Sequence, residues 1–339
     1  MATLAEIRAK LTAADSKNNG NRTKFNTAVF PHWKIQEGSQ SRLRFLPDAD
    51  TNNTYFWVEQ LMIKLPFSGI KGQSDGKPCI VQVPCMEMYG TGEACPILTE
   101  VRPWFKANDP ALEKLGKTYW KKKTYLFQGF VHENPLAEEN AAENPIRRFM
   151  VNGSIYNIVK AAVLDPEMEE LPIDYLNGLD FQVVKTSKGG FADYSTSKWA
   201  RKESALTAVE LEAIEKYGLF NLADYLPKKP DAKALEIIKE MFEASLEGEL
   251  YDPVKWGAFY KPPGLKGEQK AENAENADVQ FESAPVPVRD AYAPPPVEKA
   301  PPFEIDEEDL PVFEKPALAK PASNQKAEDI LAMIRNRKQ

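Results

Sequence analysis

The sequence predicts an α+β protein that is mainly β, with helices at its flanks. Between residues 25 and about 129, short runs of aromatic and β-branched side chains alternate with polar turns, which is typical of strands. The later segments 155–164, 207–217 and 231–246 place apolar residues three and four positions apart, as helices do. From about residue 264 the composition becomes charged and proline-rich, so the folded part is expected to end there.

Composition sets bounds on the function. The chain has 339 residues, enough for one large domain or two modest ones, and a formal net charge of −7. This charge argues at first against a nucleic-acid partner, but much of the acid lies in the last third and in the internal loop 133–144. Three cysteines and two histidines argue against a disulfide framework and suit a reducing cytoplasm. The N-terminus lacks the apolar stretch of a signal peptide, and no window approaches roughly twenty apolar residues, so we expect no membrane span.

Residues 1–22 predict a basic N-terminal arm. Thr3 and Glu6 have the spacing of a capping box, and they begin a short helix with one apolar face. A helix this short is marginal alone. We therefore expect its apolar face to dock, either on its own domain or on a neighbouring subunit.

The core is assigned to residues 23–263. Alternating or β-rich patterns predict its strands at 42–46, 55–58, 61–64 and 181–185. Acidic residues cluster at 165–170, where paired carboxylates could hold two metal ions as in a nuclease. Consecutive acids on a turn are usually a solvated face, and the chain shows no histidine–carboxylate cluster, phosphate loop or paired nucleophile and base. We therefore expect no enzymatic activity.

The segment from Lys117 to Val131, KTYWKKKTYLFQGFV, is the strongest candidate for binding. It places four lysines and three aromatic residues ahead of an apolar run and contains no acid. Lysines can hold the phosphates of a nucleic acid strand, and each unpaired base that stacks on a ring contributes about 1–3 kcal/mol. In an extended chain, Tyr125 and Phe127 share one face. The alternative is a half-buried strand whose lysines are merely solvated.

A glycine-rich loop provides a second candidate segment. Gly189 and Gly190 are followed by Phe191 and Tyr194, with Lys198 close behind in the sequence. Aromatic residues on such a loop are hard to bury, so the pattern favours binding over a place in the core.

The C-terminal region divides into two parts. Residues 264–322 predict a disordered linker and tail, first proline-rich and then acidic at 304–309. Residues 323–339 have the spacing of an amphipathic helix. Acids near the start and basic residues at the end of that helix match the helix dipole.

Several landmarks occur in a fixed order along the core. They are Leu43-Arg-Phe-Leu-Pro47, Cys95-Pro96, Lys121-Lys-Lys-Thr-Tyr125, Asn134-Pro135, Phe149, Ile155-Tyr156, Glu167-Met168, Pro172-Ile-Asp174 and Gly190-Phe-Ala-Asp-Tyr-Ser-Thr-Ser-Lys-Trp199. In this order and spacing the stretch 42–246 resembles the single-stranded DNA-binding (helix-destabilising) protein of T-even-like bacteriophages. The glycine–aromatic segment at the end is the most specific of these landmarks.

The resemblance implies an OB-fold-like β-barrel core with a small inserted subdomain. It also implies that the basic arm binds the neighbouring copy along the strand, and that the acidic tail recruits replication and recombination proteins. The implied phosphate-binding residues are Arg44, Lys121, Lys122 and Lys123. The implied aromatic residues of the groove are Tyr125, Phe127, Phe149, Phe191 and Tyr194, with Lys198 beside the last two.

The chain departs from this family at its metal site and its tail. The family holds zinc through three cysteines and a histidine, but here Leu98 stands where the third cysteine belongs, and no histidine lies upstream within reach. Zinc through Cys79, Cys85 and Cys95 would lack the fourth ligand of a tetrahedral site. We therefore expect small buried cysteines and no cofactor. In addition, a basic helix follows the acidic run, whereas the family ends with its acids.

The expected function is cooperative, sequence-nonspecific binding of single-stranded DNA. The protein would act in phage DNA replication, recombination and repair, in the cytoplasm of the bacterial host, with single-stranded DNA and further copies of itself as partners. The alternative is an RNA-binding translational regulator that uses the same groove, because base stacking does not distinguish the sugars.

Overall fold

The computed structural model describes residues 28–263, apart from 74–76, 91, 137, 139–141 and 169, together with Leu265. The predictions for the arm 1–22, for the helix 323–339 and for nearly all of the linker 264–322 fall outside the described residues.

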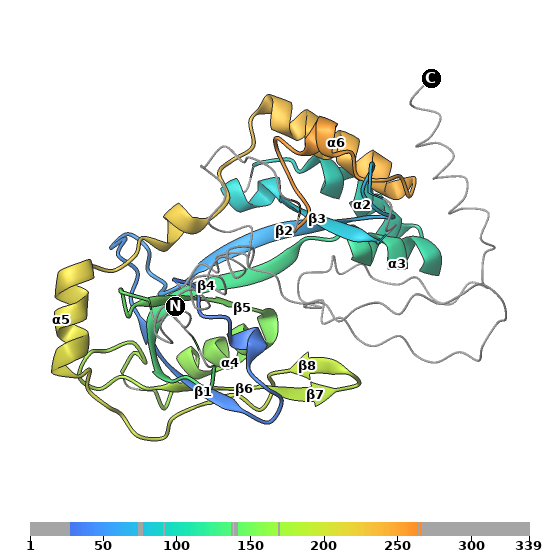
Figure 1. Cartoon of the computed structure of the whole chain (residues 1–339). Coiled ribbons are helices and arrows are strands. Elements are labelled where there is room, and N and C mark those ends of the chain that lie inside the picture. The colour runs from blue at the N-terminus through green and yellow to red at the C-terminus, as the bar shows by residue number, and fades with distance from the viewer. Residues whose placement is uncertain are drawn as a thin grey trace, which may run out of the picture.

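A mostly antiparallel sheet organises the chain (Figure 1). Its strands are β1 (Gln40–Leu46), β2 (Val58–Phe67), β3 (Cys79–Pro84), β4 (Lys122–Glu133), β5 (Arg147–Val151), β6 (Phe181–Val184) and β9 (Lys198–Trp199). Their order is β3-β2-β4-β1-β6-β9, with β5 paired to β4. A separate hairpin consists of β7 (Thr186–Lys188) and β8 (Phe191–Asp193).

Strand β4 is the element that the others share. Along one edge it pairs first with β2, over residues 122–126, and then with β1, over 128–133. Residues 125–129 pair with β5 on its other edge. Gly129 permits the close approach of β1, because a Cβ atom there would lie 1.9 Å from the carbonyl oxygen of Arg44. The mostly antiparallel sheet with helices at its flanks confirms the α+β class. Within the described residues no pairing closes the sheet, so the OB-fold barrel is not confirmed.

The helices of the described residues cover different parts of this sheet. They are α2 (Pro96–Lys106), α3 (Pro110–Tyr119), α4 (Gly153–Val163), α5 (Ala208–Tyr217), α6 (Ala232–Leu246) and α7 (Pro253–Trp256). Short 3-10 turns are η2 (His32–Lys34), η3 (Met86–Tyr89) and η4 (Leu222–Tyr225). None of these helices combines the length and the apolar character needed to cross a membrane.

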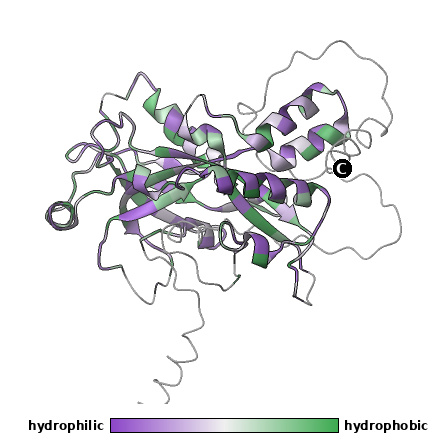
Figure 2. Cartoon of the chain, turned by 90° about the horizontal axis from the view of Figure 1, so that it is seen from above, coloured by the Kyte–Doolittle hydropathy of each residue, from purple (hydrophilic) through white to green (hydrophobic). Residues whose placement is uncertain are grey.

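Two large hydrophobic cores lie along one face of the sheet. The first packs alternate residues of β2, such as Leu61 and Ile63, against α2, α3 and α6. The second packs β1, β4, β5 and β6 against α4, with Phe45, Phe127 and Phe149 at its centre. Figure 2 shows apolar residues recurring among polar ones along these strands and helices. Because β4 runs past both cores, residues 123–125 lie where one core gives way to the other.

The sequence predicted some of these elements and missed others. The strands expected at 42–46 and 61–64 lie inside β1 and β2, and the helices expected at 207–217 and 231–246 match α5 and α6. The strand expected at 55–58 is wrong, because only Val58 belongs to a strand. Helices α2 and α3 occupy a stretch that was expected to hold mostly strands and loops.

Candidate nucleic-acid interface

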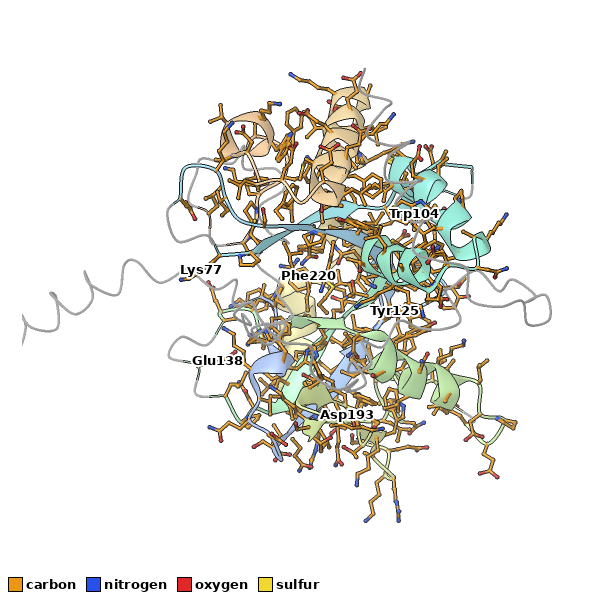
Figure 3. The ribbon with its side chains drawn as sticks, turned by 90° about the vertical axis from the view of Figure 1, so that its right-hand side faces the viewer. Lys77, Trp104, Tyr125, Glu138, Asp193 and Phe220 are labelled. Carbon is orange, nitrogen blue, oxygen red and sulfur yellow. The ribbon has the colours of Figure 1, made fainter. Side chains whose placement is uncertain are left out.

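An aromatic cluster consists of Tyr55, Trp57, Tyr125 and Tyr156. Trp57 and Tyr125 belong to the second core, and Tyr156 packs against it. Tyr125 of β4 and Tyr156 of α4 stack almost in parallel, with ring centroids 3.5 Å apart. Trp57 meets the edge of Tyr156 at 5.5 Å, and Tyr55 lies against Trp57 at 4.8 Å. In Figure 3, Tyr125 lies between the region of Trp104 and the region of Asp193.

An open pocket of about 300 Å³ adjoins the aromatic cluster. It is lined by Asn53, Tyr55, Trp57, Val58, Glu59, Tyr156 and Leu226. Tyr55 is 60% exposed and Tyr156 is half-buried, whereas Trp57 and Tyr125 are almost enclosed. Tyr55 and Tyr156 therefore present ring surface to a ligand, and Trp57 and Tyr125 support them from behind.

A hydrogen-bonded turn holds Tyr55 outward. The side-chain oxygen of Asn53 accepts from the backbone N–H of Tyr55 at 3.0 Å. The Asn53 amide nitrogen donates to Asp48 Oδ2 at 2.8 Å and to the carbonyl of Trp57 at 3.1 Å. This Asx turn bends the backbone before β2 begins at Val58. It therefore explains why the strand expected at 55–58 does not form. Sequence reasoning missed Tyr55, Trp57 and Tyr156, although an asparagine two residues before an aromatic residue was a visible turn signal.

Lysines flank the aromatic cluster on the same face. Lys123 is two residues from Tyr125 on β4, so the two side chains share a face. Lys160 lies four residues after Tyr156 on α4, one helical turn away. Lys121 was expected at the interface too, but its Nζ forms an ion pair with Glu87 Oε2 at 3.0 Å, and its side chain is 18% exposed. A phosphate at Lys121 would have to compete with that carboxylate.

Lys122 and Lys64 form a second cationic position on the opposite face of the same strands. Lys122 lies across from Met62, two residues from Lys64, and its Nζ donates to the carbonyl oxygen of Lys117 at 2.9 Å. Burial, together with the charge of Lys64, lowers the pKa of Lys122 to about 8, and burial lowers the pKa of Lys64 as well. Neither lysine has an ion-pair partner among the described residues. An anion placed there would raise the pKa of both lysines.

Arg44 is enclosed and contradicts the expectation that it binds a phosphate. Its side chain is inaccessible, and its Nη1 pairs with Asp180 Oδ1 at 3.3 Å and with Ser204 Oγ at 3.0 Å. Nη2 donates to the carbonyl oxygens of Asp174 and Ser204. A Cβ atom at Gly178 would lie 2.6 Å from Nη2, so the chain closes around the guanidinium. Arg44 thus ties β1 to the loops at 174–180 and 204.

Most of the aromatic residues expected along the groove belong to the second core. Phe127 and Phe149 are fully buried, and Phe127 packs on Phe45 with centroids 4.8 Å apart. Tyr194 is 3% exposed, its ring lies 5.6 Å from that of His32, and burial raises its pKa to about 12. None of the three can stack on a base as placed. Of the expected aromatic residues, only Tyr125 joins the cluster.

Phe191 and Lys198 lie on β8 and β9. Gly189 and Gly190 have φ of 62° and 84°, which suits a two-residue hairpin turn, so the expected loop is the tip of β7–β8. Phe191 is half-buried on this hairpin, and Lys198 is exposed on β9. Figure 1 shows the hairpin extending beyond β6. Neither Phe191 nor Lys198 lines the pocket at the aromatic cluster.

The cysteines do not gather at one point. Cys85 and Cys95 are buried side by side, and a hydrogen bond from the Cys85 thiol lowers the pKa of Cys95 below its ordinary value. The sulfur of Cys79 instead donates to the carbonyl of Gly69 at 3.7 Å. Across the described ranges, no group of three or more histidine, cysteine or acidic side chains is placed to hold a metal ion.

His132 is a further titratable group that sequence reasoning did not single out. Its Nδ1 lies 3.0 Å from Asp180 Oδ2, and its Nε2 lies 2.6 Å from Glu210 Oε1. Glu210 also completes the capping box of α5 with Thr207. The hydrogen bond with Asp180, and then that with Glu210, raises the pKa of His132 above its ordinary value of 6.5. Through Glu210, the His132 ring connects β4 to α5.

This raised pKa predicts a pH-dependent contribution to stability. A group whose pKa is higher in the folded state stabilises the fold fully below its unfolded pKa, and this contribution is lost as pH rises through the folded pKa. The free energy of unfolding of the wild type should therefore exceed that of His132→Gln most at pH values below 6.5, with the difference falling above that value. Urea titrations of both proteins over a pH series measure this difference. A difference that grows with rising pH would contradict the ion-paired state of His132.

Comparison of the chain with models of known protein families finds no match, and comparison with curated proteins finds no similar sequence.

Proposed function

We propose that this protein is a non-catalytic binder of single-stranded DNA. The observation that carries the proposal is the exposed ring of Tyr55 at an open pocket, beside the stacked pair Tyr125–Tyr156. Lys123 lies two residues from Tyr125 on β4, and Lys160 lies one helical turn from Tyr156 on α4. Exposed rings suit unpaired bases, which stack on them, and lysines suit the phosphates between those bases. Duplex DNA buries its base faces and cannot use the rings in this way.

The contacts that hold the rings of the cluster in place favour a binding surface, because a ring exposed by chance would not need them. Tyr55 is held by the Asn53 turn, and Tyr156 is braced by Tyr125 and Trp57. Rings that are fixed before binding lose little conformational freedom when a base arrives, which increases affinity. The phosphates would meet Lys123 and Lys160 on this face, whereas Lys64 and Lys122 lie on the opposite face of the same strands.

The wider picture belongs to the same proposal. We infer that β1, β4, β5 and β6 form an open, OB-like core, with β2, β3 and their helices as the inserted subdomain. The arm 1–22 would join neighbouring copies on a strand, and the acidic tail would recruit replication and recombination proteins. Such a protein would serve phage DNA replication, recombination and repair.

The test is a fluorescence titration of the full chain with single-stranded DNA, RNA of the same sequence and duplex DNA, at several salt concentrations. Single strands should bind more tightly than duplex, and each lysine that meets a phosphate should contribute roughly −0.7 to the slope of log affinity against log salt. Replacing Lys123 by alanine should flatten the slope by about 0.7. The control is Lys239→Ala, which removes an exposed charge from α6.

Two results would overturn the proposal. One is equal affinity for duplex and single strands, and the other is a salt slope that Lys123→Ala leaves unchanged while Lys239→Ala reduces it. Tighter binding of RNA than of DNA would keep the surface and change the substrate.

A further inference from the structure

The pocket beside the aromatic cluster contains an acidic group that the proposed function does not use. Glu59 is exposed at the pocket and has no hydrogen bond or ion pair among the described residues. The other polar lining side chain next to Tyr55, that of Asn53, uses its oxygen and its nitrogen within the turn. A carboxylate on a surface for phosphates weakens binding by repulsion unless the ligand offers it hydrogen atoms.

The backbone places this carboxylate beside the rings. Tyr55, Trp57 and Glu59 all line the same pocket, the first two from the turn before β2 and Glu59 from β2 itself. Glu59 is also the partner of Tyr125 in the pairing of β2 with β4. Side chains at directly opposite positions have Cβ atoms roughly 5 Å apart. A base that stacks at the cluster would therefore meet the carboxylate at its edge.

An ionised carboxylate accepts hydrogen bonds at two oxygens and donates none. Guanine presents two N–H donors side by side on its Watson–Crick edge, N1–H and N2–H, which match a carboxylate in a bidentate, charge-assisted pair. Adenine and cytosine offer a single amino group next to an acceptor nitrogen, and thymine offers a single N–H between two carbonyl oxygens. In those bases, the remaining acceptors face the negative charge.

We propose that Glu59 makes this pocket selective for guanine among the unpaired bases of a bound strand. This inference rests on the proposed function, because it assumes that a base enters the pocket. The protein would then bind most strands through stacking and phosphate contacts, and it would hold more tightly where a guanine reaches the pocket. Glu59 is in this view a specificity residue, and Tyr55 serves every base alike.

The experiment uses the full chain and short oligothymidines that carry one central dG, dA, dC or deoxyinosine, or no substitution. Fluorescence anisotropy gives the affinity for each, at a salt concentration fixed throughout. The dG oligonucleotide should bind about tenfold more tightly than the dA one, within the range known for a bidentate contact to a base. Deoxyinosine keeps N1–H and lacks the 2-amino group, so its affinity should fall between the two.

The matched variants are Glu59→Gln and Glu236→Gln, which remove one negative charge from the pocket and from the exposed face of α6. Glu59→Gln should abolish the preference for dG, and Glu236→Gln should keep it. Equal affinity of the wild type for all oligonucleotides, with Glu59→Gln raising every affinity alike, would show that Glu59 only repels the strand. That result leaves the proposed function standing, whereas absence of any single-strand binding would remove both.

Discussion

Replacing Arg44 by methionine is expected to lower the free energy of unfolding by about 3–5 kcal/mol, the usual effect of removing one partner of a buried ion pair. The substitution leaves Asp180 without its arginine and leaves the carbonyl oxygens of Asp174 and Ser204 without a donor. Methionine fills part of the space, so the loss is electrostatic more than steric. Urea unfolding followed by circular dichroism measures it.

The matched control is Arg42→Met, two residues away on the same strand. Arg42 reaches Glu133 at 3.6 Å, and its side chain is 42% exposed, so its loss should lower the free energy of unfolding by less than about 1 kcal/mol. If Arg44→Met were as stable as the control but bound DNA poorly, the phosphate role implied by the family resemblance would hold after all.

Tyr55→Ala is expected to weaken single-strand binding by about 1–3 kcal/mol, the value of one base stacked on a ring. Because Tyr55 is 60% exposed and packs mainly on Trp57, the melting temperature should hardly change. Phe127→Ala should do the opposite, since it removes a fully buried ring and should lower the free energy of unfolding by about 3–5 kcal/mol.

Phe191→Ala separates the two candidate surfaces. Phe191 lies on the β7–β8 hairpin and does not line the pocket at the aromatic cluster, so this variant should bind single strands as the wild type does. Loss of affinity in Phe191→Ala, with Tyr55→Ala unaffected, would move the binding surface to the hairpin.

The sequence predicted the elements whose pattern depends on near neighbours. The spacing of apolar residues in 231–246 gave α6, and alternation around Leu43 gave β1. Helices α2 and α3 were missed in a stretch dominated by strand-forming residues. Each nevertheless begins with a proline at its first turn, after Cys95 and after Asp109, and this is a start signal that the residue pattern did contain.

The site was harder to predict, because burial depends on segments far away in the chain. A period of two places Tyr125 and Phe127 on one face, but it does not reveal that α4 presents Tyr156 to the first residue while the core encloses the second. Arg44 looks like a surface cation in an alternating strand until residues 174–180 and 204 fold over it. Lys122 looks solvated in the sequence, but the fold partly buries it, and this burial lowers its pKa to about 8.

The sharing of β4 between two cores determines how the chain can be divided. Residues 122–126 of β4 pair with β2, while 128–133 pair with β1, so a fragment that kept only one core would break a continuous strand. Along β4 there is therefore no linker at which a protease could separate the two cores. The two cores are expected to lose their protection from hydrogen exchange together, as one cooperative unit, and a ligand that braces Tyr125 would slow exchange in both.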